Sequence, residues 1–258
     1  MHLAIKPARK TTKAAVHARS ASLPHEGSHP VIAYLGDSIR TLRSWSAGAA
    51  CWASGIALVD AVLAALGDLL ALPQAVEALH ETAACDQLLD MFLVLADAYG
   101  SFQSALITLK QSVAELQAGT RCGDGVVVAA SLRAHRRTEK ELSRLVATMR
   151  HPTMRPVDTM GNEVISIVAE VAAAIAEASE AIFLELVPVA QTSNKWLSRL
   201  SIRPSAKKGA TETVMSALER LEKLEECIDV LETGSENVFR RLLQFRVSLL
   251  NIHSLLTL

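Results

Sequence analysis

The fold of this chain is decided near its C-terminus by residues 214–256, VMSALERLEKLEECIDVLETGSENVFRRLLQFRVSLLNIHSLL. Apolar residues recur there at alternating spacings of three and four, which is the repeat of one face of an α-helix. Of the thirteen positions in this repeat only Ser235 is polar; they are Val214, Ala217, Leu221, Leu224, Ile228, Leu231, Ser235, Val238, Leu242, Phe245, Leu249, Ile252 and Leu256. The pattern predicts one helix over about residues 211–256, of which residues 214–256 alone would span about 65 Å. A helix of that length must pack against other helices or against a partner.

The apolar face of this helix has two interpretations. We define its seam as Leu221, Leu224, Ile228, Leu231, Val238, Leu242, Phe245, Leu249 and Ile252. Acidic residues are concentrated in the first half of the helix and arginines in the second half. In two antiparallel copies, each acidic half would face a basic half, which would favour a homo-oligomer. Phe239 and Cys227 widen the apolar face, however, and a wide face favours burial inside the chain's own bundle, which we prefer. Gly234-Ser235 is the place where a bend or break is expected.

Composition and the remaining apolar stripes predict an all-α fold. Half of the 258 residues are hydrophobic and only 4% are aromatic, which favours packed helices over a sheet. The second strongest stripe runs over residues 88–116, with a C-cap expected at Gly119 and a turn at Gly123-Asp-Gly125. Pro188 is expected to kink or end a helix that begins near residue 158. We predict an elongated antiparallel bundle of five to six long helices, forming one domain over residues 30–258.

Residues 1–29 are basic and polar without periodicity, which predicts a disordered arm. Within the arm, Arg19, Ser20, Ser22 and Pro24 match a 14-3-3 binding motif once Ser22 is phosphorylated. A doubly charged phosphate on a flexible segment would meet an arginine cluster on such a partner. The alternative is an ordinary serine-rich tail.

Residues 129–150 form a second basic segment, predicted to be a helix. Its cations before the final Arg150 are Arg133, Arg136, Arg137, Lys140 and Arg144. One interpretation is contact with nucleic acid or an anionic membrane; the other, which we prefer, is pairing with the acidic half of the C-terminal helix. Because the chain has a net charge of −1 and this segment has no interleaved aromatic residues, nucleic acid is not expected to be a partner.

A third basic segment has the composition of a membrane interface. It spans residues 195–208, and its relevant residues are Lys195, Trp196, Arg199, Arg203, Lys207 and Lys208. Tryptophan beside apolar and basic residues is typical of a helix lying on a lipid surface. A segment packed on the bundle is the preferred alternative. The longest uncharged run, residues 44–59, is shorter than a membrane span, and the pattern leaves open whether residues 44–72 contact a membrane.

No pattern of residues predicts catalysis, a cofactor or a metal site. Glu77 and His80 have the spacing of half a carboxylate di-metal site, but the second half is missing from the sequence. The four cysteines are scattered without a CxxC pair, and the N-terminus has no apolar signal segment. These features favour a non-enzymatic protein in a reducing, intracellular compartment.

Three blocks of sequence resemble a known family. They are HARSASLP at residues 17–24, followed by His29-Pro30; CDQLLD at residues 85–90, leading to the basic segment; and LEKLEECI at 221–228 with VFRRLL at 238–243 and RVSLLNI at 246–252. The chain resembles the plant-specific family related to the BYPASS-like proteins over nearly its whole length. The resemblance implies a helical protein linked to root and shoot development, with no catalytic residue to carry over. The function expected is therefore interaction or scaffolding, with docking to a membrane surface through residues 195–208 as the alternative.

Overall fold

The computed structural model describes residues 29–48, 52–80, 82–150, 161–201 and 209–254, with backbone alone for residues 52, 150, 185, 187–201 and 209–213. The described residues form seven helices and no strand. Their bounds are α1 Pro30–Gly48, α2 Trp52–Leu70, α3 Pro73–Leu79, α4 Ala83–Cys122, α5 Gly125–Arg150, α6 Glu163–Ser201 and α7 Gly209–Ser254. The all-α prediction is confirmed, with six long helices and the short α3.

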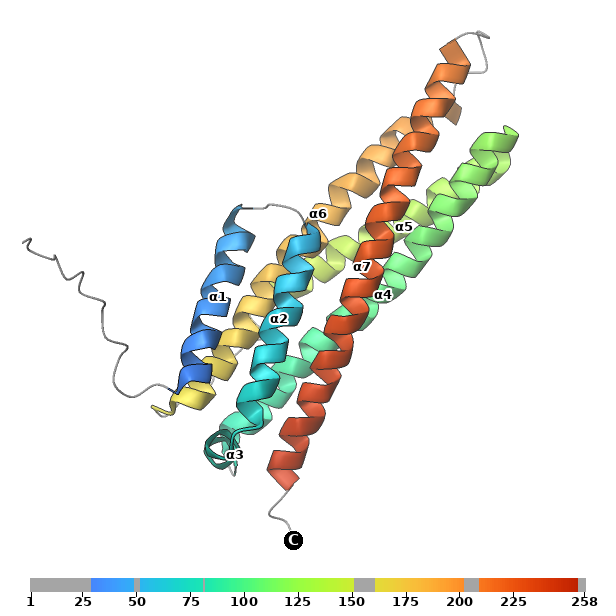
Figure 1. Ribbon diagram of the computed structural model, residues 1–258. Coiled ribbons are helices and arrows are strands. Elements are labelled where there is room, and N and C mark those ends of the chain that lie inside the picture. Colours follow the sequence, from blue (N-terminus) through green and yellow to red (C-terminus); the bar gives the residue numbers. More distant parts are fainter. Residues whose placement is uncertain (1–28, 49–51, 81, 151–160, 202–208, 255–258) are drawn as a thin grey trace, which may run out of the picture.

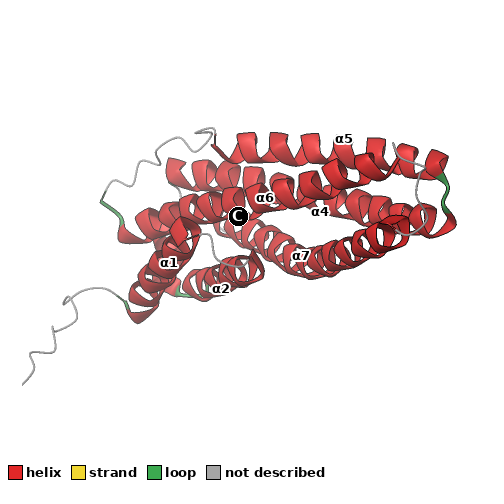
Figure 2. Ribbon diagram, turned by 90° about the horizontal axis from the view of Figure 1, so that it is seen from above, coloured by secondary structure: helices red, strands yellow, loops and turns green. Residues whose placement is uncertain are grey.

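The four longest helices run side by side along an elongated molecule (Figure 1). Helix α4 contacts α5, α6 and α7, and α5 contacts α4 and α6. Viewed from above, α5 and α7 lie on opposite sides of α4 and α6 (Figure 2). Helices α1 and α2 cover one end of this bundle, where α2 packs against α1, α6 and α7. The chain therefore forms an antiparallel bundle with an added helical hairpin.

The seam of α7 is buried inside this bundle. All nine seam residues are at most 5% exposed. Phe245 packs on Phe92 of α4 with 4.2 Å between ring centroids, and Phe239 lies against Gly100 of α4. Later residues of α7 thus meet earlier residues of α4, so the two helices are antiparallel. The apolar stripe of residues 88–116 is the counterpart of the seam.

An aromatic cluster joins α4 to α6. The rings of Phe102 and Phe183 stack with centroids 4.2 Å apart, and Tyr99 meets Phe183 edge-on at 5.6 Å. The Tyr99 hydroxyl lies 3.0 Å from Ser179 Oγ, which itself donates to the carbonyl of Ile175 at 2.6 Å. Because the serine hydrogen is used there, the tyrosine is the donor of the pair. Burial raises the pKa of Tyr99.

The turn between α4 and α5 corrects one predicted helix end. The sequence pattern predicts a C-cap at Gly119, but α4 continues to Cys122 and ends at Gly123, whose φ of 70° is left-handed. Gly119 is instead a contact point: a β-carbon on it would lie 3.0 Å from Val128 Cγ2 and 3.1 Å from Val127 Cγ1. Its small size lets the start of α5 fold back closely on α4.

Two predicted interruptions are continuous helix in the structure. Helix α7 passes through Gly234 and Ser235 without a break, and Ser235 Oγ donates to the carbonyl of Glu232 at 3.1 Å. Helix α6 continues through Pro188 to Ser201, so it does not end at the proline. A proline removes one backbone hydrogen bond, and a helix packed against several neighbours tolerates that loss.

Two helices have the length and apolar composition of a membrane span, namely residues 53–70 of α2 and the whole of α4. In each, half of the residues are buried inside the protein. Core helices of a bundle have these same properties. The contacts of α4 with α5, α6 and α7 account for its apolar composition without a membrane.

Candidate functional site

The acidic half of α7 is bound by α4. Lys110 of α4 lies between two carboxylates of α7, 2.7 Å from Glu232 Oε2 and 2.9 Å from Asp229 Oδ1. Hydrogen bonds to Glu232 and Asp229 raise the pKa of Lys110. Further along, Gln117 Nε2 donates to Glu225 at 2.8 Å. The acids of α7 therefore set the register of α7 on α4.

This arrangement contradicts the preferred interpretation of the basic segment, now seen as α5. Its cations were expected to pair with the acidic half of the C-terminal helix, but α4 and α6 separate α5 from α7 (Figure 2). Arg121, at the end of α4, supplies another cation to α7 by lying 3.6 Å from Glu222. The sequence pattern shows both charge runs but not the order of the helices around the bundle.

Helix α5 owes its position to one apolar face and a capped start. Val128, Leu132, Leu142 and Val146 are buried against the neighbouring helices. The Oδ1 atom of Asp124 accepts from the backbone N–H groups of Val126 at 2.9 Å and Val127 at 3.1 Å, which satisfies two of the donors at the helix start. The face opposite the core is thereby held toward solvent.

That outer part of α5 carries five exposed cations, which we name the basic face: Arg133, Arg136, Arg137, Lys140 and Arg144. Arg144 pairs with Glu141 of the same helix at 2.7 Å. The other four have no ion pair or hydrogen bond with the residues that the structure describes. The basic face is therefore largely unneutralised by the described bundle.

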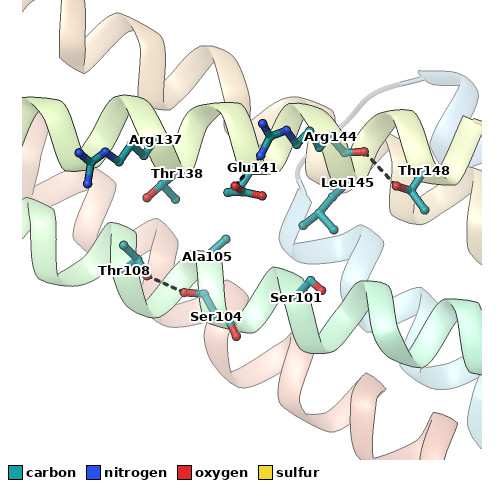
Figure 3. Close-up of a pocket in the computed structure, with 10 residues that line it drawn as sticks. All are labelled: Ser101, Ser104, Ala105, Thr108, Arg137, Thr138, Glu141, Arg144, Leu145 and Thr148. Carbon is teal, nitrogen blue, oxygen red and sulfur yellow. Dashed lines mark hydrogen bonds and ion pairs between the residues drawn. The ribbon is translucent and has the colours of Figure 1, made fainter.

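A groove of about 400 Å³ lies between α4 and α5 beside the basic face, and polar groups interrupt a surface that is mostly apolar. It is lined by Ser101, Ser104, Ala105, Thr108, Arg137, Thr138, Glu141, Arg144, Leu145 and Thr148. Figure 3 shows Arg137 and Arg144 on α5 flanking Glu141, with the three hydroxyl residues of α4 on the facing helix. Ser101, Ser104 and Thr108 were not predicted as site residues. Their three-four spacing, which puts three hydroxyls on one helix face, is the signal that identifies them.

Most hydroxyls of the groove are donors within their own helices. Thr108 Oγ1 donates to the carbonyl of Ser104 at 2.9 Å, and Ser104 Oγ donates to that of Gly100 at 3.1 Å. On α5, Thr148 Oγ1 donates to the carbonyl of Arg144 at 3.1 Å. Since each hydrogen is used locally, the lone pairs of these oxygens are available to accept from a ligand. The groove therefore offers acceptors from hydroxyls and Glu141, and donors from two arginines.

A second groove, of about 580 Å³, lies between α2 and α7. Its carboxylates already have cationic partners. Asp60 binds Arg241 at 2.5 Å, and Asp229 binds Lys110. These pairs hold α7 to α2 and α4, so this groove is better explained as part of the scaffold.

Several predicted site residues lie outside what the structure describes. The phosphorylation motif of Arg19, Ser20, Ser22 and Pro24 falls in residues 1–28, and Arg203, Lys207 and Lys208 fall in residues 202–208. Lys195, Trp196 and Arg199 belong to the last turns of α6, where the backbone alone is described. The roles predicted for these residues therefore stay predictions.

Glu77 and His80 stand at the end of a short helix. Glu77 lies on α3, and His80 is the residue that caps its C-terminus. Within the described part of the chain, no three histidine, cysteine, aspartate or glutamate side chains come together as ligands for a metal ion. The basic face and the adjoining groove are thus the features with the clearest chemistry.

Taken together, these features define an all-α bundle protein with a buried C-terminal helix and an exposed basic face. The chain belongs to the BPS1 family, because the family model described as Protein BPS1 matches residues 55–252, from α2 to the end of α7. This is the plant BYPASS-like family, so the resemblance noted in the sequence is confirmed. Family membership indicates a plant protein related to development. No curated protein and no solved structure matches the chain.

Proposed function

We propose that this protein is a non-enzymatic, intracellular interaction protein that binds an acidic protein partner through the basic face of α5. The bundle acts as the scaffold, because its core and interhelical ion pairs hold α5 in place. The partner supplies carboxylates to cations that the described bundle leaves unpaired. Such binding would serve the developmental role of the family.

The observation that carries this proposal is the unneutralised charge on α5. Arg133 and Arg137 are four residues apart, as are Arg136 and Lys140, so like charges face each other on the helix surface. Each such pair destabilises an exposed helix by about 0.2–0.5 kcal/mol. Glu139 and Glu141 lie on the same helix, but among the described residues no acid is within ion-pair distance of these four cations. A partner with acidic residues would remove the repulsion and gain charge-assisted hydrogen bonds.

Proximity labelling in plant tissue tests the proposal. The full chain, fused to a labelling enzyme, is compared with a variant carrying Arg133→Glu, Arg136→Glu and Lys140→Glu. We expect a set of labelled proteins with acidic surfaces to be lost from the variant, because reversed charges repel the partner.

A matched control reverses three cations elsewhere on the surface, with Arg40→Glu, Lys223→Glu and Arg240→Glu. These three side chains are 76%, 70% and 67% exposed, and each pairs within its own helix. The control should keep the labelled set of the wild type. Loss of the same proteins from both variants, or from neither, would contradict the proposal.

Membrane docking through residues 195–208 is the competing proposal. It is supported by the composition of that segment, in which Trp196 stands among five basic residues without an acid. Flotation with liposomes, with and without Lys207→Glu and Lys208→Glu, separates it from protein binding. Flotation that is absent, or unchanged by the substitutions, would rule the docking segment out.

A further inference from the structure

We propose that the groove between α4 and α5 binds a phosphorylated polyol, either as a free molecule or as the headgroup of a lipid. The groove and its donors and acceptors are separate from the outermost cations of the basic face. This inference goes beyond the proposed binding of an acidic protein and does not rest on it. It depends on which hydrogen-bonding groups the groove presents.

Two arginines supply the phosphate-binding half of the site. Arg137 and Arg144 both line the groove and are seven residues apart, about 10.5 Å along the helix axis. Arg137 has no acidic partner among the described residues, and Arg144 has one, Glu141. A guanidinium has five N–H donors, so Arg144 can bind a phosphate oxygen while keeping its carboxylate. Two phosphates on one small molecule would engage the two arginines.

Most of the other polar groups of the groove are acceptors, which a bare anion could not use. The hydroxyl groups of Ser104, Thr108 and Thr148 donate their hydrogens to backbone carbonyls of their own helices. Glu141 stands between the two arginines and would repel a simple anion (Figure 3). Hydroxyl groups of a ligand would donate to these oxygens and to the carboxylate. A ligand that combines phosphates with hydroxyl groups satisfies both halves of the groove.

The volume agrees with a ligand of that size. About 400 Å³ lies within the range of sites for small organic molecules. A single sulfate or phosphate ion would leave most of this space to water. Leu145 and Ala105 add apolar surface, which can pack against the carbon ring of a polyol.

Calorimetric titration of the full chain tests the site. The probes are inositol trisphosphate, pyrophosphate and unphosphorylated inositol, all at about 0.15 M salt, where the Debye length is about 8 Å. We expect saturable binding of inositol trisphosphate that is at least about ten-fold tighter than that of either other probe. Arg137→Gln and Arg144→Gln should each weaken it about ten-fold or more, since each removes a charge-assisted contact.

The matched control is Arg136→Gln, which removes the same charge from the same helix but does not line the groove. It should change the affinity by less than about two-fold once salt screens distant charges. An equal loss with Arg136→Gln, pyrophosphate binding as tight as that of inositol trisphosphate, or no saturable binding would each overturn the proposal. None of these outcomes depends on whether an acidic protein binds the outer face.

Two further measurements make the test independent of any one variant. Glu141→Met should tighten pyrophosphate binding while lowering the preference for inositol trisphosphate several-fold, because the carboxylate accepts from ligand hydroxyls; an unchanged preference would contradict its role. In the wild-type protein, inositol trisphosphate should protect Arg137 and Arg144, but not Arg136, from modification by phenylglyoxal. Equal modification of all three with and without the probe would overturn the site.

Vesicles distinguish the two sources of the ligand. Sedimentation is compared for phosphatidylcholine vesicles carrying phosphatidylinositol bisphosphate or carrying phosphatidylserine at matched charge. Binding to the phosphoinositide vesicles that Arg137→Gln abolishes would support a lipid headgroup, and binding of the free trisphosphate alone would support a soluble ligand. Equal binding to both vesicle types with no effect of Arg137→Gln would show surface charge alone and overturn the proposal.

Discussion

Gly234 of α7 lies directly against the side chain of Ile56 of α2. A β-carbon on Gly234 would come within 2.7 Å of Ile56 Cγ2, closer than van der Waals contact permits. The glycine that marks the expected weak point of the long helix is therefore a place where α2 approaches it very closely. Nearby, Arg241 binds Asp60 and fastens the same two helices.

Gly234→Ala should consequently destabilise the protein even though alanine is the better helix former. The substitution gains about 1 kcal/mol of helix propensity but forces Ile56 to move, and overpacking costs about 1–3 kcal/mol. Gly67→Ala is the matched control, because Gly67 is also inside a helix and a β-carbon added to it would meet nothing within 4 Å. Urea denaturation should show Gly67→Ala stabilised and Gly234→Ala destabilised. Equal stabilisation of both would refute the close contact.

Because Tyr99 is buried, we expect the folded protein to lose stability at alkaline pH. Its folded pKa is raised by burial above the ordinary value near 10, so the unfolded chain releases the phenolic proton first as pH rises. The contribution of Tyr99 is thus fully present below pH 10 and declines above it. Tyr99→Phe should cost about 1 kcal/mol at neutral pH, through the lost bond to Ser179, and should lose less stability between neutral pH and alkali. A pH dependence identical to that of the wild type would contradict this role.

Because like charges lie close together on the basic face, we expect removal of one positive charge to stabilise the folded protein. Arg136 lies one turn from Lys140 and from Arg133, and Glu139 offsets part of that repulsion, so Arg136→Gln should stabilise the folded protein by about 0.2–0.5 kcal/mol at low salt. Salt should abolish the gain, since it screens exposed charges. Arg240→Gln is the control, because Arg240 pairs with Glu236 and its removal should stabilise nothing. Thermal unfolding at two salt concentrations measures both, and a destabilised Arg136→Gln protein would count against unpaired charge on α5.

Burial of the seam predicts unequal effects along α7. Phe245→Ala should cost about 3–5 kcal/mol, because it opens a cavity against Phe92. Val247→Ala, at a side chain that is 55% exposed, should change stability by less than about 0.5 kcal/mol. If an intermolecular coiled coil held the seam, the loss from Phe245→Ala would instead depend on protein concentration. Denaturation at several concentrations distinguishes these results.

Much of the fold follows from periodicity in the sequence. The stripes that predict the seam and residues 88–116 come from spacing alone, and the structure packs these two faces together. The ends of helices are predicted less well, because their prediction rests on single residues. The sequence pattern predicts a cap at Gly119 and a bend or break at Gly234-Ser235. Both glycines instead lie where another helix comes close, and such contacts depend on distant residues. A glycine needed for flexibility and a glycine needed for space look alike in one sequence.

The candidate site could be predicted only in part. The cations of α5 are evident in the sequence, but their pairing depends on which helices are neighbours. Lys110 and Arg121 of α4 form ion pairs with acidic residues of α7. Those acidic residues therefore do not pair with the basic face of α5. The groove combines Arg137 and Arg144 with hydroxyls that lie about thirty or more residues earlier, so no local pattern reveals it. The order of helices around the bundle is the information that spacing does not contain.

Site-directed photocrosslinking tests the role of α5 most directly. A photoreactive amino acid is placed at Ser143, an exposed position beside Lys140 on the outer face of α5, or at Ser166, an exposed position on α6. Neither substitution removes a cation. In plant extract, we predict a discrete crosslinked protein from position 143 whose crosslinked peptide is acidic, with its yield falling at high salt, and none from position 166. Equal crosslinking from both positions, or from neither, would contradict the assignment of the basic face as the interaction surface.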